Sequence, residues 1–127
     1  MTEPRLRVSD EDGETWDDPS EDQIQRLYAR LNLRRRFLVL DRLDVPETEV
    51  GRHYLQLALN DDLTMVIEYR QGSAATHYRA DVPLPSDQGG EEIALPVLLG
   101  WASGRPGWSE GLSWVRWDTA RECPWGA

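Results

Sequence analysis

Residues 54–70 read YLQLALNDDLTMVIEYR, two apolar runs joined by the polar residues Asn60, Asp61 and Asp62. In the second run, every second residue at positions 63–69 is a large apolar or aromatic one. This period of two is typical of a strand with one buried face. A short polar turn between two such runs is typical of a hairpin. The segment therefore predicts two adjacent antiparallel strands.

A third strand is predicted at residues 77–82, after the polar and small residues 71–75. This strand ends at Pro83, which cannot donate a hydrogen bond to a neighbouring strand, so we expect it at the edge of the sheet. The continuous apolar run at residues 37–40 predicts a central strand. The middle of the chain thus predicts an antiparallel meander.

Both ends of the chain add shorter strands. Residues 5–8 and 14–17 flank a polar cluster that ends in Gly13, and this arrangement predicts a short hairpin. Residues 112–118 predict a closing strand. Trp114 and Trp117 are three residues apart, so we expect them on opposite faces of that strand.

Ser20 opens the clearest helix signal in the chain, because Gln23 follows it at the spacing of a capping box. The apolar residues that come next repeat at helical spacing, and they are Ile24, Leu27, Tyr28 and Leu31. This stripe predicts a helix with one buried face. The three arginines at 34–36 are expected near its C-terminal end, where the helix dipole favours positive charge.

A second, short helix is predicted within the apolar residues 93–101. Pro96 lies inside this run, and proline is tolerated in the first turn of a helix, so we expect Pro96 in that turn. Ser103 and Gly104 are expected to end the helix.

Together these elements predict the α+β class, with a mainly antiparallel sheet of about five to six strands packed against two helices. The 127 residues are expected to form one domain, residues 1–127, with one continuous core. No apolar run approaches the roughly 20 residues that span a bilayer, and residues 1–14 lack the pattern of a secretory signal. A single cysteine, Cys123, suits a reducing compartment, so we expect a cytoplasmic protein.

The net charge of −9 is unevenly distributed. Residues 1–22 contain nine acids against Arg5 and Arg7, whereas the other acids are nearly balanced by arginines. Such a field repels nucleic acid and anionic membranes and attracts basic proteins. We therefore expect a basic protein partner, no direct nucleic acid and no membrane. A solubilising acidic face without a partner is the alternative.

The residues needed for catalysis are sparse. His53 and His77 are the only histidines and match no zinc-site spacing, and the chain has no lysine, which excludes Schiff-base chemistry. A calcium loop starting at Asp10 fails because its sixth position is Thr15 rather than glycine. We expect a protein without catalytic residues, metal or cofactor. A small enzyme that uses carboxylates stays an alternative.

Acidic and tryptophan residues are the candidates for partner binding. Carboxylates attract a basic partner, and tryptophan is enriched in binding hot spots although it also fills cores. Five of the six tryptophans fall in the last 27 residues. The predicted partner-binding residues are Asp10, Glu11, Asp12, Asp17, Asp18, Asp61, Asp62, Trp108, Trp114 and Trp117.

Several features follow one another in a particular order along the chain. They are a strand and polar turn at 5–13, a capped helix at 20–31, a meander at 37–80, VPLP at 82–85, Trp101, GRP at 104–106, and LSWVRW at 112–117. This order resembles the Imm1 family of bacterial polymorphic-toxin immunity proteins over nearly the whole chain.

The resemblance implies an intracellular inhibitor of a secreted toxin, often a nucleic-acid-targeting enzyme such as a deaminase or nuclease. It brings no catalytic residues with it. From the acidic and aromatic residues we hypothesise occlusion of the toxin's active or substrate-binding site, with acids raising the association rate and aromatic side chains slowing dissociation. The alternative is a protein-interaction adaptor of a secretion or phage-related system.

Overall fold

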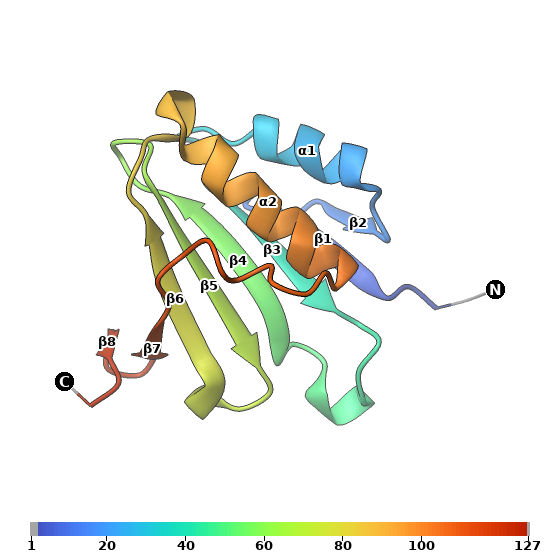
Figure 1. Cartoon of the computed structure of the whole chain (residues 1–127). Coiled ribbons are helices and arrows are strands. Elements are labelled where there is room, and N and C mark those ends of the chain that lie inside the picture. The colour runs from blue at the N-terminus through green and yellow to red at the C-terminus, as the bar shows by residue number, and fades with distance from the viewer. Residues whose placement is uncertain (1–2, 127) are drawn as a thin grey trace.

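The computed structural model describes residues 3–126 as an eight-stranded antiparallel sheet with two α-helices on it (Figure 1). The strand order is β2-β1-β3-β4-β5-β6-β7-β8. The strands are β1 (Leu6–Asp10), β2 (Thr15–Asp17), β3 (Phe37–Arg42), β4 (His53–Leu59), β5 (Met65–Gln71), β6 (His77–Val82), β7 (Val115–Asp118) and β8 (Cys123–Pro124). The helices are α1 (Glu21–Ala29) and α2 (Gly90–Ser103), with short 3-10 turns at η1 (Glu47–Glu49), η2 (Ala74–Thr76) and η3 (Ser86–Gln88). The predicted α+β class is confirmed, with more strands than expected.

Both α-helices lie on the same face of the sheet (Figure 1). The meander directs alternate side chains toward them, and Leu55 and Leu57 of β4 and Ile67 of β5 are fully buried there. Leu98 of α2 is equally buried in the same cluster. The alternation seen in the sequence therefore produces one hydrophobic core between the sheet and the helix layer. Among residues 3–126, no helix has the length and apolar character to cross a bilayer.

Helix α1 begins as predicted. Ser20 Oγ accepts a hydrogen bond from the Gln23 backbone N–H at 3.1 Å, which satisfies one of the free N–H groups of the first turn. The stripe of Ile24, Leu27 and Tyr28 is buried against the core. The helix ends at Ala29, so residues 34–36 lie beyond it, just before β3, and not in its last turn.

Helix α2 differs from the prediction, because it begins at Gly90 and places Pro96 in its interior. Gly89 at φ 101° turns the chain into the helix. Four buried residues at helical spacing hold the helix on the sheet, and they are Ala94, Val97, Leu98 and Trp101. The Pro96 ring is exposed. Burial of this stripe outweighs the one hydrogen bond that proline cannot donate.

Strand β6 is not the edge strand that Pro83 suggested. Strand β7 pairs with it through Tyr78–Arg116 and Arg79–Val115, and β8 extends the sheet by one more strand. Pro83 follows the last residue of β6 and so interrupts no pairing. The closing strand is also shorter than predicted, since it starts at Val115 and leaves residues 112–114 outside the sheet.

Candidate partner-binding surface

Two acidic turns that are far apart in the sequence meet at one end of the sheet. In the antiparallel register Asp10 pairs with Leu38, and Phe37 pairs with Ala58. The β1–β2 turn follows the end of β1 and the β4–β5 turn follows the end of β4, and both turns therefore lie at the same end of the sheet. We name Glu11, Asp12, Asp61 and Asp62 the acidic end.

Arg35 and Arg36 connect the two turns of the acidic end. Arg35 Nε lies 2.7 Å from Asp12 Oδ2, and Arg36 Nη1 lies 2.7 Å from Asp61 Oδ1. The Arg36 backbone N–H also donates to Glu11 Oε2 at 3.3 Å. Such exposed ion pairs add little stability, but they balance two of the four carboxylate charges. Asp62 and Glu11 lie in no ion pair within residues 3–126.

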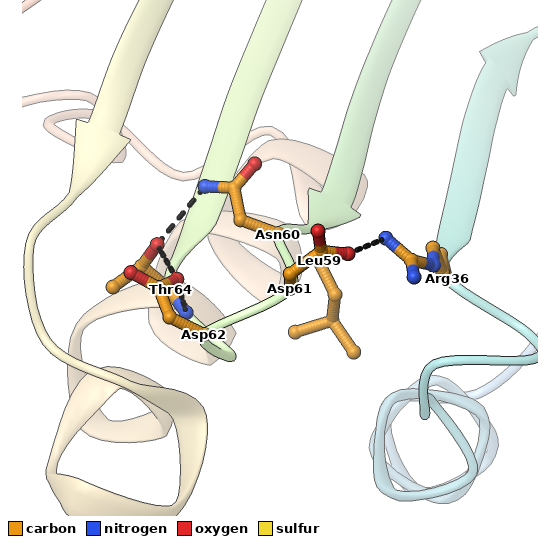
Figure 2. A pocket seen from close by; sticks show the side chains of 6 residues that line it. All are labelled: Arg36, Leu59, Asn60, Asp61, Asp62 and Thr64. Carbon is orange, nitrogen blue, oxygen red and sulfur yellow. Dashed lines mark hydrogen bonds and ion pairs between the residues drawn. The ribbon is translucent and has the colours of Figure 1, made fainter.

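The β4–β5 turn is shaped by hydrogen bonds of its own side chains (Figure 2). Asp62 Oδ1 accepts from the backbone N–H and the hydroxyl of Thr64, and Asn60 Nδ2 donates to Thr64 Oγ1 at 3.0 Å. These bonds stabilise the Asp62 carboxylate and lower its pKa below 3.8. Asp62 is therefore charged at neutral pH.

An open hollow of about 500 Å³ lies beside this turn. It is lined by Arg36, Leu59, Asn60, Asp61, Asp62 and Thr64 (Figure 2). The Asp61 side chain is 88% exposed, so its carboxylate is accessible from solvent even while it contacts Arg36. The hollow presents two carboxylates, which can accept hydrogen bonds from a cationic side chain of another protein, and one guanidinium, which is already paired with Asp61.

Asp10 does not belong to this surface, contrary to the prediction. Only 5% of the residue is exposed, and Oδ1 accepts the Glu14 backbone N–H at 3.0 Å. Within the described residues, Oδ2 accepts no hydrogen bond. Asp10 lies on the buried face of β1, where the sheet alternation that buries Leu6 and Val8 also buries its carboxylate.

Asp17 and Asp18 lie at the opposite end of β1 and are not brought together with the acidic end. Asp17 pairs with Arg7 at 2.7 Å, and this guanidinium lowers the pKa of the carboxyl. Asp18 Oδ1 accepts the backbone N–H groups of Arg5 and Leu6 at 2.8 and 3.1 Å. Asp18 thus fastens the N-terminal segment to the end of β2.

Trp108 and Trp114 form an aromatic cluster with Tyr69 and pack against the core. Their ring centroids lie 5.0 and 4.8 Å from that of Tyr69, and Trp114 Nε1 donates to Ser109 O at 2.7 Å. Trp117 instead stacks with Arg79, 4.4 Å from its ring centroid, on the sheet face away from the helices. Of Trp114 and Trp117, Trp114 is therefore the one that packs against the core. None of the three lines the hollow at the acidic end.

Each histidine contacts one carboxylate. His53 Nε2 lies 3.1 Å from Glu49, and the buried His77 places Nε2 3.0 Å from Glu68 and Nδ1 3.4 Å from the Tyr54 hydroxyl. Across residues 3–126, no three or more His, Cys, Asp or Glu side chains are grouped to hold a metal ion.

No family model, curated protein or solved structure matches this chain. Sequence reasoning missed Arg35 and Arg36 as members of this surface. Their sequence position beside the predicted strand at 37–40 was visible, but their contacts depend on the register between β1, β3 and β4.

Proposed function

We propose that this protein is a cytoplasmic immunity protein that binds and neutralises a cognate bacterial toxin. The supporting observation is the convergence of Glu11, Asp12, Asp61 and Asp62 from two distant turns, in a chain of net charge −9. A toxin that acts on nucleic acid, such as a deaminase or nuclease, needs a basic substrate-binding surface. The acidic end is complementary in charge to such a surface and would occlude it.

Asp62 and Glu11 are the main sources of attraction in this proposal. Asp12 is paired with Arg35, and Asp61 is paired with Arg36. A cation of the partner must therefore compete with an arginine for each of these two carboxylates. Long-range attraction raises the association rate more than it lowers the dissociation rate. Inhibition by occlusion requires no catalytic residue and no cofactor from this chain.

The first test is co-expression with a toxin whose gene neighbours that of this protein. Rescue of growth and co-purification of the two chains are expected. If growth is not rescued and no complex forms, the proposed function is wrong. A stable complex with a protein that is not toxic would instead favour the adaptor alternative.

The second test measures the association rate with the purified toxin at several salt concentrations. The double substitution Glu11→Arg with Asp62→Arg should slow association about tenfold at low salt and flatten its salt dependence. The matched control is Asp44→Arg with Glu47→Arg, two exposed acids at the other end of the sheet, which changes the net charge equally. Equal slowing by both pairs would refute a local role of the acidic end.

A further inference from the structure

A groove with apolar walls adjoins the acidic end. It has a volume of about 310 Å³ and lies between the end of α1, the η3 turn and the β4–β5 turn. Its lining residues are Tyr28, Ala29, Leu31, Leu59, Leu63, Ser86, Asp87 and Glu91. Leu59 also lines the hollow of Figure 2, so the two depressions are neighbours.

The walls of the groove are held in place by contacts between different elements. The Tyr28 hydroxyl lies 2.7 Å from Ser86 Oγ and donates to Met65 Sδ at 3.4 Å, which ties α1 to η3 and β5. The Ser86 backbone N–H donates to Leu63 O at 2.9 Å. The groove is therefore formed by the folded chain itself, with little reorganisation needed before a ligand enters.

Leu63 has an unusual backbone for its side chain. Its φ of 69° lies in the left-handed region, which a leucine seldom adopts and where asparagine or glycine is at ease. The Leu63 N–H donates to Asn60 O at 3.0 Å and closes the turn. The turn thus places the apolar side chain of Leu63 in the groove wall, although the left-handed backbone at this position would suit asparagine or glycine.

Carboxylates border this groove on two sides. Asp87 and Glu91 line it directly, and Asp61 and Asp62 border the adjoining hollow. No arginine is among the residues lining the groove, and within residues 3–126 neither Asp87 nor Glu91 lies in an ion pair. A ligand that fits has an apolar side chain for the groove and positive charges on both flanks.

We propose that this groove receives one apolar side chain of a toxin segment, flanked by lysine or arginine residues that meet Asp62 on one side and Asp87 and Glu91 on the other. This proposal rests on the proposed function and identifies where on this protein the toxin would be anchored. Leu31 and Leu63 are partly buried side chains that line the groove, whereas Trp108 and Trp114 line neither the groove nor the hollow. Burial of an apolar anchor slows dissociation and adds to the charge attraction.

Two substitutions test the groove in the complex with purified toxin. Leu63→Asn removes the apolar wall and loses some packing against the core, but asparagine suits the left-handed backbone, so the variant should still fold, which thermal unfolding without toxin checks. Ala29→Trp fills the groove from the exposed end of α1. We expect each to raise the dissociation rate about tenfold, with the association rate of Leu63→Asn unchanged. Val50→Asn, an exposed apolar residue at the other end of the sheet, is the matched control.

The outcomes separate the groove from the proposed function. If wild-type protein binds the toxin and both variants dissociate at the wild-type rate, the groove inference is wrong and the immunity role stands. If the wild-type protein forms no complex, both proposals fail. If light scattering shows a wild-type dimer that Ala29→Trp abolishes, the groove binds a second copy of this chain and the inference is overturned.

Discussion

Gly100 of α2 offers a test of where Trp108 lies. A Cβ added to Gly100 would lie 2.8 Å from Trp108 Cβ, closer than two such carbons approach in folded proteins. The Trp108 Cβ is fixed by its backbone and cannot rotate away. Gly100→Ala must therefore displace residues 107–109, or the helix, and disturb the contact between Trp108 and Tyr69.

Two opposing effects set the size of this change. Alanine is better than glycine in a helix interior by about 1 kcal/mol. Overpacking a filled site costs about 1–3 kcal/mol. We expect a net loss of about 1 kcal/mol in the free energy of unfolding, which corresponds to a fall of about 4 °C in Tm for a chain of this size.

Urea denaturation of a double-mutant cycle isolates the contact. In a Trp108→Gly background the Cβ is gone, so Gly100→Ala should stabilise the protein by about 1 kcal/mol. In a Trp108→Ala background the Cβ remains, so Gly100→Ala should still destabilise. If Gly100→Ala stabilises all three backgrounds equally, Trp108 does not pack on α2 and would again be a candidate for the partner surface.

Three further predictions concern the fold. Burial raises the pKa of Asp41 above 3.8, so its ionisation opposes folding as pH rises from 3.8; Asp41→Asn should raise Tm at pH 7 but not below pH 3.8, and a gain that persists in acid would contradict this cause. Ser20→Ala should lower stability by about 1 kcal/mol in urea denaturation, whereas Ser20→Asp should preserve the cap of α1. Leu98→Ala should cost about 2–5 kcal/mol, because the side chain is fully buried; a loss well under 1 kcal/mol would mean that α2 does not cover the sheet.

Local patterns predicted the elements whose burial alternates or repeats. The meander at β4 and β5 and the capped start of α1 were predicted because each has a clear period in the sequence. Helix α2 was placed too late because residues 93–101 are apolar on every side, so Pro96 was the only positional signal. Strand β8 has two residues, which is too short for a sequence pattern to predict it. It is defined by its pairing with Trp117 and Asp118.

Which residues form the acidic end depends on the strand register, and no local sequence pattern predicts that register. Asp10 and Glu11 are neighbours in the chain, yet the alternation of β1 buries the first and leaves the second exposed. The link between Asp12 and Asp61 passes through Arg35 and Arg36, from a third segment. The groove was missed for the same reason, since its walls come from residues up to 63 positions apart.

The position of the acidic end on turns has a consequence for how a partner's identity could change. The side chains of Glu11, Asp12 and Asp61 are exposed and lie outside the core, so substituting them changes the surface with little effect on stability, whereas Asp62 also stabilises the β4–β5 turn through Thr64. Leu63, in the neighbouring groove, differs from these acids because it packs against the core as well as lining the groove. Under the proposed function, exchanging Glu11, Asp12 or Asp61 would therefore change partner recognition directly, whereas a different apolar anchor would require a compensating change inside the protein.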